Sequence, residues 1–595
     1  MTACSIFAIL LSMKQFLSNF WQAQKTIWLF LGTRKRPYVF YNSLIFIIFF
    51  YDLVPAFIFG QIVDFFTHYE KGQSLLPFYL LGIILSVSWT FVSILRLTCK
   101  NKLSNISIVA RSNARVMSIN NLLNLSAEYH SSRNSGNSLQ QIFTGSQAIN
   151  DIIKLMYRNI WSIFASFLGI ITVFIFLSPP LLIFMAAYST IFFIIEFYFN
   201  GVLTRLSKSE NLSLEKSSGS IVETTGNILA VKSLGFEKEI YEHLSRKEEV
   251  IKKIQLEKSN IKNLKWKFFQ VLNGLSLGIF VFLIGRGVIN GLITVGSILV
   301  FYSYYNKLRE ATQATTDAIT DFIEYSTSLS RLKEIFESDK ITIRDGVLFP
   351  SDWQFIKFNN VDFSYPTNDR GLSGLNLKIN KGEILGVVGS SGSGKSTLAK
   401  LLVDLYQPSS GEIMVNDLPY SKISHSDLLE SISVVPQEVE LFNLSIVENI
   451  SIMRSINKEL LQKVIVISEL DEVIKKLPQG INTLIGEKGY ALSGGERQRV
   501  GIARALYKNA EIIIFDEATS MLDGKTEKKI IGNVLKAFSG QKTFVFVAHR
   551  LAALDAADRI IVFKEGKLVE EGSYVELKDK GGLFAKLFES QIKNS

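Results

Sequence analysis

Six long apolar segments in the first half of the chain restrict its fold more than any other feature. They run over about residues 38–63, 75–97, 157–177, 181–199, 268–289 and 293–309. A helix of about 20 apolar residues crosses the hydrocarbon core of a bilayer. Because a segment in lipid must satisfy its backbone hydrogen bonds internally, each should be a helix. The sequence therefore predicts an all-α membrane domain of six spans.

The charges between these segments predict the orientation of the domain. Lys and Arg number 64 against 54 Asp and Glu, a net charge of +10 in 595 residues. The excess lies in residues 34–36, 98–158 and 201–267, whereas Lys71 is the main cation on the other side. The positive-inside rule then places both termini in the cytoplasm and the spans in the cytoplasmic (inner) membrane. This distribution explains the charge without nucleic acid, so we expect no nucleic-acid partner.

Composition and hydropathy divide the chain into four parts. Residues 1–37 contain a stretch, 16–31, in which apolar residues mix with Gln and Lys, as in an interfacial helix. The membrane domain follows over 38–337, then a linker over 338–352, and a soluble α/β domain over 353–595. A cleaved signal peptide is not expected, because residues 6–11 lack a basic flank and a cleavage site. Met13 remains an alternative start.

Cysteine usage and the long cytoplasmic connections add two further expectations. Cys4 and Cys99 are the only cysteines, too few for a disulfide framework and without the spacing of a metal site. The connections 98–158 and 201–267 have helical periodicity, so the helices should extend beyond the bilayer. Gly136 and Gly235 are the expected turns within these connections.

The run Gly389-Ser-Ser-Gly-Ser-Gly-Lys-Ser-Thr397 is the most informative stretch of the second half. It lies between a strand-like run, 383–388, and a run with helical spacing, 398–403. Glycines in such a turn let backbone N–H groups surround phosphate oxygens at the positive end of a helix. The residues expected to bind the nucleotide here are Gly389, Ser390, Ser391, Gly392, Ser393, Gly394, Lys395, Ser396 and Thr397. Lys395 would reach the β and γ phosphates, and Ser396 would bind Mg²⁺.

A second short run, Leu492-Ser-Gly-Gly-Glu496, predicts the start of a helix. Glu496 follows Ser493 by three residues, which is the pattern of a capping box. The helix would present the N–H groups of Gly494 and Gly495 to an anion such as a γ-phosphate. A helix cap without a ligand is the alternative for this run taken alone.

With Arg497-Gln-Arg499 after it, this run closely resembles the signature of the ATP-binding cassette (ABC) family. The resemblance covers the whole chain: cassette motifs follow from about residue 353, and the six spans ahead of them are similar to the exporter pattern. It implies a half-transporter with a six-span all-α membrane domain, followed by an α/β P-loop ATPase domain that uses ATP and Mg²⁺.

Further motifs resemble the catalytic parts of the family. The strand-like run 512–517 ends in two carboxylates, Asp516 and Glu517. The resemblance implies that Asp516 holds Mg²⁺ through water and that Glu517 polarises the attacking water. Gln437 resembles the glutamine that senses the γ-phosphate beside the metal, and His549 the switch histidine that contacts this phosphate.

Two other resemblances concern the base and the dimer contact. Tyr365 resembles the aromatic residue that stacks on adenine. Residues 518–523 resemble the loop that contacts the second cassette, so Asp523 is counted with the nucleotide-binding residues. Met521 departs from the pattern, because the family usually has alanine there.

The family resemblance also implies a second half-transporter. In this family ATP lies between the glycine loop of one cassette and the signature of the other, and this chain has one cassette. A homodimer is expected because no catalytic motif is degenerate, and a heterodimer remains open.

Polar residues within the spans give a candidate substrate cavity. Gln270, Asn273 and Ser276 are spaced to share one face of the fifth span, and Tyr304 lies in the sixth. Asp52 in the first span is a further candidate, because intramembrane carboxylates are costly. For Glu196 in the fourth span, a hydrogen bond between helices is at least as good an explanation.

These observations favour ATP-driven export of a lipophilic, lipid-linked or peptide substrate. The six spans argue against a soluble cassette ATPase, and a cassette-regulated channel is the remaining rival. A peptidase-containing exporter is disfavoured, because fewer than 40 residues precede the first span. The sequence leaves the cargo open among lipids, lipid-linked glycans, peptides and drugs.

Overall fold

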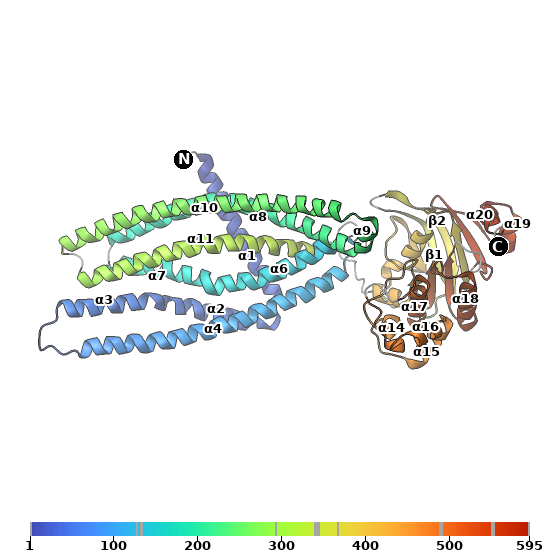
Figure 1. Cartoon of the computed structure of the whole chain (residues 1–595), viewed down its shortest axis with the longest axis horizontal. Helices are drawn as coiled ribbons and strands as arrows, with labels where there is room; N and C mark the ends of the chain where they lie inside the picture. The colour runs from blue at the N-terminus through green and yellow to red at the C-terminus, as the bar shows by residue number, and fades with distance from the viewer. Residues whose placement is uncertain are drawn as a thin grey trace. The chain divides into compact units, whose positions relative to one another are not determined.

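The computed structural model describes residues 3–126, 129–130, 135–177, 179–291, 294–337, 346–365, 368–486, 492–548 and 554–592. The chain divides into two units (Figure 1). Unit 1 comprises residues 1–125 and 129–339, and unit 2 comprises 126–128 and 340–595. The part of the expected linker 338–352 that is described packs onto unit 2, where Phe349 is buried in the core.

Unit 1 consists of long helices joined by short turns (Figure 1). Its first helices are α1 (Ala3–Phe30), α2 (Lys35–Phe49), α3 (Val54–Thr67), α4 (Leu76–Leu123) and α6 (Ser135–Leu155). They are followed by α7 (Trp161–Leu177), α8 (Pro179–Gly226), α9 (Ile228–Leu234), α10 (Glu237–Ile289) and α11 (Val295–Glu337). One-turn 3₁₀ helices cover Gly32–Arg34 and Phe50–Leu53, and a π-helical turn, Met156–Ile160, joins α6 to α7.

Hydropathy separates α11 from the other long helices. Over the described residues, five helical segments are long and apolar enough to cross a membrane: Gly32–Thr67, Leu76–Leu123, Asn137–Ile175, Pro180–Gly226 and Glu237–Ile289. The sixth expected span, at the start of α11, is helical. It is too polar to count as a membrane-spanning segment by the same measure, because Asn306 and Lys307 interrupt its apolar run. As expected, the helices continue far past the apolar segments, since α4 ends at Leu123 and α8 at Gly226.

The first expected span, 38–63, lies within Gly32–Thr67, one of the segments apolar and long enough to cross a membrane, and contains a short 3₁₀ turn. A 3₁₀ turn, Phe50–Leu53, separates α2 from α3. Pro55 in the first turn of α3 explains the break, because proline has no N–H to donate to the preceding turn. Asp52 lies in this break and not within a regular helix.

One of the two turns predicted from glycine is wrong and the other is confirmed. Gly235 ends α9 with φ +69°, a left-handed conformation that favours glycine. Gly136, in contrast, lies in the first turn of α6.

A fully buried ion pair connects three helices of unit 1. Lys265 on α10 donates to Glu196 on α8 at 3.0 Å, and Thr316 on α11 donates to the second oxygen of Glu196 at 3.0 Å. Glu196 and Lys265 are 0% and 1% exposed. Of the two explanations for Glu196, the interhelical contact is therefore the one that the structure shows.

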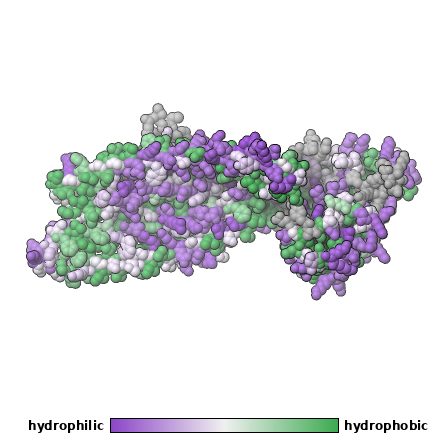
Figure 2. All heavy atoms as spheres, viewed as in Figure 1, coloured by the Kyte–Doolittle hydropathy of each residue, from purple (hydrophilic) through white to green (hydrophobic). Residues whose placement is uncertain are grey.

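Apolar side chains dominate one part of the unit 1 surface. On the face drawn in Figure 2 they gather over the end where α3 and α4 are joined, and polar residues cover the middle of the unit. Phe57, Ile83 and Val87 are examples of large apolar side chains exposed in this apolar part. A bilayer would cover such a surface, which agrees with membrane-spanning helices.

Unit 2 is built on two sheets. The four-stranded sheet has the order β2-β1-β4-β5, with strands β1 (Phe355–Tyr365), β2 (Asn368–Asn380), β4 (Ser410–Val415) and β5 (Leu418–Pro419). The six-stranded sheet has the order β10-β9-β3-β8-β7-β6, with β3 (Ile384–Gly389), β6 (Ile432–Val435), β7 (Ile512–Asp516), β8 (Thr543–Val547), β9 (Arg559–Lys564) and β10 (Lys567–Gly572). Strands β3, β6, β7, β8 and β9 are parallel, and the first sheet is antiparallel.

Helices cover these sheets and enclose two large apolar cores. They are α12 (Lys395–Leu402), α13 (His425–Ser431), α14 (Ile446–Ser451), α15 (Lys458–Ile467), α16 (Asp471–Lys476), α17 (Gly494–Tyr507), α18 (Gly524–Phe538), α19 (Tyr574–Asp579) and α20 (Leu583–Ile592). Short 3₁₀ turns cover Tyr420–Lys422 and Gly480–Asn482. The buried parallel strands place the ends of β3 and β7 at the same edge, where ligands bind in such sheets.

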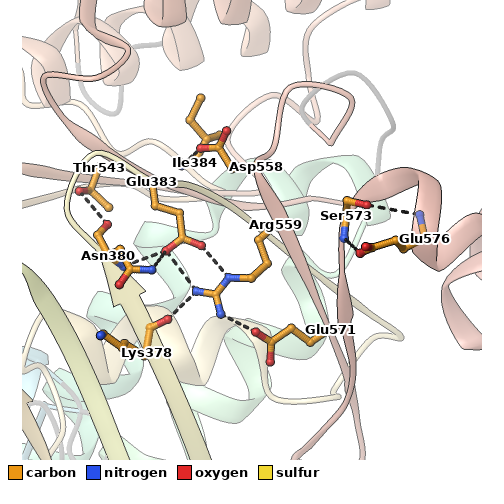
Figure 3. A network of polar contacts seen from close by, with 10 residues as sticks. All are labelled: Lys378, Asn380, Glu383, Ile384, Thr543, Asp558, Arg559, Glu571, Ser573 and Glu576. Carbon is orange, nitrogen blue, oxygen red and sulfur yellow. Dashed lines mark hydrogen bonds and ion pairs between the residues drawn. The ribbon is translucent and has the colours of Figure 1, made fainter.

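Arg559 links the two sheets (Figure 3). From β9 it donates to Glu383 at 2.7 Å, to Glu571 on β10 and to the carbonyl oxygen of Lys378 on β2. Glu383 also accepts from the backbone N–H of Asn380 at 2.8 Å. Because the Glu383 side chain is only 9% exposed, its charge depends on these donors.

We expect Arg559→Met to destabilise unit 2 locally by about 2 kcal/mol, because it leaves the Glu383 carboxylate without its main donor. Hydrogen exchange of the β3 and β9 amides in the full chain should then be faster by roughly tenfold to thirtyfold. The matched control is Arg454→Met, whose partner Glu430 is 54% exposed. That variant should change exchange little, and equal effects of the two would contradict the role of Arg559.

Candidate functional site

The glycine loop has the predicted strand, turn and helix around it. β3 ends at Gly389 and α12 begins at Lys395. Gly392 and Gly394 have φ of +75° and +111°. A Cβ on Gly394 would lie 2.6 Å from Leu372, and one on Gly389 would lie 2.4 Å from the Phe563 carbonyl oxygen. Larger residues therefore cannot form this turn without moving its neighbours.

Lys395 lies inside the loop. Its ammonium group donates to the carbonyl oxygens of Gly389 and Ser390 at 3.0 and 3.1 Å. Burial lowers the pKa of Lys395, and the nearby charges of Glu517 and Asp516 oppose this effect. The ammonium group of Lys395 thus lies against the backbone of the loop, where it would contact a bound phosphate.

Ser393 in the same loop supports an anionic ligand. Its side chain is 2% exposed, and its hydroxyl has no hydrogen-bond partner among the described residues. A buried hydroxyl without a partner is unusual, because the missing hydrogen bond costs free energy. A phosphate oxygen in the loop would provide that partner.

Ser396 and Asp516 form an oxygen pair at the carboxyl edge of the sheet. The Ser396 hydroxyl donates to the Asp516 carboxylate at 3.1 Å. Burial raises the pKa of Asp516, which the Ser396 hydrogen bond partly offsets. No group of three His, Cys, Asp or Glu that could hold a metal occurs in the part of the chain that the structure describes. A hydroxyl and one carboxylate fit Mg²⁺, because this ion takes few protein ligands and completes its shell with water and phosphate.

Glu517 is placed by a strained backbone. It follows β7 in a left-handed conformation, with φ +51°, and its N–H donates to the Val547 carbonyl oxygen at 3.0 Å. The side-chain amide of Gln437 donates to its carboxylate at 2.9 Å. Such strain in a non-glycine residue is typical of functional sites. The structure therefore brings Gln437 and Glu517 together, as a catalytic pair would require.

Tyr365 lies beside α12 in an aromatic cluster. Its ring packs against Phe363 and Tyr406, with centroids 4.9 and 5.4 Å away. Its hydroxyl lies 3.3 Å from that of Thr397, and the Lys400 ammonium lies 5.3 Å from its ring centroid. The tyrosine is thus fixed next to the loop, and its stacking on adenine remains a prediction.

The predicted capping box at Ser493 is confirmed. The Ser493 hydroxyl accepts from the Glu496 N–H at 3.3 Å, and the Glu496 carboxylate accepts from the Ser493 N–H at 2.8 Å. The hydrogen bond from the Ser493 N–H lowers the pKa of the Glu496 carboxyl group. This effect is larger than the opposing effect of burial. The first residues of α17 are Gly494 and Gly495. The N-terminus of α17, capped in this way, can bind an anion.

Gln498 and Met521 were not assigned a role from the sequence. Buried Gln498 on α17 accepts from the Met521 N–H at 3.0 Å and donates to Ser520 at 3.2 Å. A Cβ on Gly494 would lie 2.8 Å from the Met521 sulfur. The loop 518–523 is thus fixed to the signature helix, with methionine covering Gly494. The unusual Met521 was the only sequence signal for this contact.

Asp523 begins α18 as its N-cap. Its carboxylate accepts from the N–H groups of Lys525 and Thr526 at 3.1 and 3.0 Å. The hydrogen bonds from Thr526 lower the pKa of Asp523. A structural role therefore accounts for this aspartate, and its nucleotide contact stays a prediction.

His549 lies outside the described residues.

The predicted residues thus form two separate groups in one chain. Lys395, Ser396, Asp516, Glu517 and Gln437 belong to the loop group. Over the described ranges, no hydrogen bond joins this group to the signature residues Ser493, Gly494 and Gly495.

Comparison with known families gives a direct assignment. The profile described as ABC transporter transmembrane region matches residues 40–311, and the profile described as ABC transporter matches residues 372–520. The chain belongs to the ABC transporter family. Both parts, the helical membrane region and the ATPase domain, lie in one polypeptide, so this is a fused half-transporter and an integral membrane protein.

Curated relatives of this ABC transporter match it over part of their length. An ATP-dependent lipid A-core flippase of Chromobacterium violaceum is 42% identical over 239 residues, which are 40% of this chain and 41% of the relative. A leukotoxin translocation ATP-binding protein of Mannheimia haemolytica is 37% identical over 310 residues, 51% of this chain and 43% of the relative. An alpha-hemolysin translocation ATP-binding protein of Escherichia coli is 36% identical over 309 residues, with the same coverage. The chain thus spans about two fifths of the length of each.

A solved structure shows the same fold as this ABC transporter. It is a bacterial Atm1-family ABC exporter with ATP bound, with a TM-score of 0.86 and 24% sequence identity. The match covers 94% of this chain and 99% of that chain. A helical membrane domain followed by a P-loop ATPase domain is therefore the correct fold class.

The four residues expected to line a substrate cavity do not share one open surface. Asn273 accepts from Tyr188 at 2.7 Å, and Tyr304 donates to the Leu53 carbonyl oxygen at 3.1 Å. Both are buried inside the bundle, whereas Gln270 is exposed. Asp52 pairs with Arg96 at 2.5 Å and lies 3.6 Å from Lys307. The structure thus places Asn273 and Tyr304 inside the bundle, and a substrate cavity lined by these four residues stays a prediction.

We expect Glu517→Gln to reduce ATP hydrolysis by about 100-fold or more, because an amide cannot accept a proton from water. Nucleotide binding should persist, since Lys395, Ser396 and Asp516 are unchanged. Phosphate release and equilibrium binding of radiolabelled ATP measure the two properties. The matched control, Glu565→Gln, changes another glutamate with positive φ, +50°, that bonds to none of these residues. Near-normal hydrolysis by Glu517→Gln would remove it from the catalytic role.

Proposed function

We propose that this ABC transporter uses ATP hydrolysis to export a substrate across the cytoplasmic membrane, by alternating access, as a dimer of half-transporters. The observation that carries the proposal is that the residues expected to bind phosphate form two groups, with no hydrogen bond between the two among the residues that the structure describes. The loop group contains the cation, the metal ligands and the catalytic pair. The signature group contains a capped helix end. Each group is half of a nucleotide site.

The loop group suits the β and γ phosphates and Mg²⁺ of ATP. The backbone of residues 389–397 and Lys395 would hold the phosphates, and Ser396 with Asp516 would hold the metal. When bound, Mg²⁺ neutralises charge that develops on the phosphates. Glu517 would orient and deprotonate water, and Gln437 would keep the Glu517 carboxylate in place.

The signature group suits the γ-phosphate of a nucleotide held by another chain. Ser493 caps α17, and its glycines allow close approach to the helix end. Closure of two chains over two nucleotides would complete both sites. Because both groups are intact in this chain, we propose a homodimer, and a heterodimer with a related chain would be built in the same way.

The membrane unit would convert closure into transport. Its helices extend from the apolar segments well beyond the membrane, so movement of their ends would alter the spans. The named relatives are a lipid A-core flippase and translocators of leukotoxin and alpha-hemolysin. A lipophilic, lipid-linked or peptide substrate agrees with this range, with both termini and the ATPase domain in the cytoplasm.

Complementation between two inactive chains tests the shared site. Lys395→Met disables the loop group. Ser493→Asp disables the signature group by placing a carboxylate against phosphate, while aspartate still caps the helix. Each variant alone should lose about 100-fold in hydrolysis. A mixed dimer, purified through two different tags, contains one site with neither change, so it should recover a large fraction of the wild-type rate in liposomes.

Two controls make the result decisive. Ser573→Asp alters the matching capping box of α19 and should leave hydrolysis unchanged. A mixed dimer of wild type with the double variant Lys395→Met, Ser493→Asp has one change in each site and should stay inactive. If the first mixed dimer were as inactive as its parents, each chain would hydrolyse ATP by itself and the proposal would be wrong.

A further inference from the structure

Arg504 and Asn449 form a clamp in unit 2 that the proposed nucleotide chemistry does not use. Arg504 lies in the last turn of the signature helix α17, and Asn449 lies in α14. The Arg504 guanidinium donates to the carbonyl oxygens of Glu440 and Asn449, each at 2.9 Å, and to the carboxamide oxygen of Asn449 at 3.0 Å. One side chain thus joins α17 to two other segments.

Asn449 continues these bonds along the segment 436–444. Its carboxamide nitrogen donates to the carbonyl oxygens of Phe442 at 3.0 Å and of Ser445 at 3.1 Å, and its oxygen accepts from the Phe442 N–H at 2.9 Å. Asn449 is 1% exposed. Residues 436–444 belong to no helix or strand, so the two side chains of the clamp bind backbone groups that regular structure would otherwise pair. The clamp therefore determines the course of this segment.

The middle of α17 packs against the same segment. A Cβ on Gly501 would lie 2.5 Å from a methyl group of Val439, which is too close without movement of one of them. The absence of a side chain at Gly501 therefore allows α17 to contact Val439 directly. In the sequence Val439 and Glu440 follow Gln437 by two and three residues. The segment that carries Gln437 is thus fixed to α17 at two consecutive residues.

Gln437 has few contacts of its own. Its side chain is exposed, and among the residues that the structure describes its hydrogen-bond partner is Glu517, at 2.9 Å. Its backbone forms no hydrogen bond to another backbone group in the described ranges. The position of its amide therefore depends on the two ends of its segment. One end follows Val435, the last residue of β6, and the clamp holds the other end at Glu440.

The guanidinium group of Arg504 suits this position by its shape. Burial lowers the pKa of Arg504, and its acceptors are oxygens of neutral amide groups. A partly buried cation is costly where no carboxylate balances it. The planar fork of a guanidinium reaches acceptors on two segments at once, which the single ammonium group of lysine does not. The chain thus has a costly cation where its fork holds the segment 436–444.

We propose that Arg504 is a positioning residue for ATP hydrolysis, which holds Gln437 on Glu517 by fixing the segment 436–444 to α17. The inference rests on the proposed function, because it takes Glu517 as the residue that activates water. Without the fork of Arg504 the segment moves, and the Gln437 amide leaves the Glu517 carboxylate. Nucleotide binding persists, because the glycine loop and Lys395 belong to other elements of the unit.

A double-mutant cycle with the full chain in liposomes tests this positioning. Arg504→Lys keeps the cation and loses the fork, so kcat for ATP hydrolysis should fall about tenfold while KM changes little. Gln437→Ala should lower kcat by at least as much. Because Arg504 acts through Gln437, the double variant should be no slower than Gln437→Ala alone. A further loss of about tenfold in the double variant would overturn the proposal.

Lys508→Met is the matched control. Lys508 ends the same helix, is half-buried like Arg504, and donates to the carbonyl oxygens of Leu429 and, at 2.7 Å, of Ile432. Neither acceptor belongs to the segment 436–444, so this variant should keep kcat near the wild-type value. Hydrogen exchange of the segment should be about tenfold faster in Arg504→Lys and unchanged in Lys508→Met. Unchanged exchange in Arg504→Lys would also overturn the proposal.

The outcomes separate this inference from the proposed function. Near-normal hydrolysis by Glu517→Gln would contradict the proposed chemistry itself. If Glu517→Gln and Gln437→Ala are both slow but Arg504→Lys hydrolyses ATP at the wild-type rate, only the positioning role is wrong. Normal hydrolysis by Gln437→Ala would overturn that role as well, because Arg504 would then have no functional group to position.

Discussion

The nucleotide site depends on a close approach between the turn after β3 and the strands beside it. Gly389 lies where any Cβ would contact the Phe563 carbonyl oxygen on β9, and Gly394 lies equally close to Leu372. This packing holds the backbone of the loop, and the loop in turn holds Lys395 against its own carbonyl groups. Because β7 is part of the same sheet, the packing also brings Asp516 to Ser396.

The cassette was the more predictable part of the chain, because local sequence determines its elements. The continuous apolar runs predicted β3 and β7, and the spacing of Ser493 and Glu496 predicted the start of α17, which the structure confirms. The contact between Gln498 and the Met521 backbone joins segments that only the tertiary structure brings together. Met521 marked the loop as unusual, but no local pattern indicated Gln498 as its partner.

The membrane unit shows what hydropathy alone leaves open. Hydropathy located the spans, but it does not indicate whether a polar side chain within a span contacts a neighbouring helix or lines a cavity. Asn273 and Tyr304, predicted to face a cavity, instead bond to neighbouring helices. Pro55 and Asp52 could have indicated the 3₁₀ turn in the first span.

Cysteine crosslinking between chains tests the shared nucleotide site most directly. The two native cysteines, Cys4 and Cys99, can be replaced, and Ser391→Cys and Ser493→Cys introduced in the Glu517→Gln chain. The account predicts a disulfide-linked dimer that forms with ATP and Mg²⁺ and not without them, because the nucleotide brings the loop of one chain to the signature of the other. Crosslinks within single chains, or a dimer yield that does not respond to ATP, would contradict it.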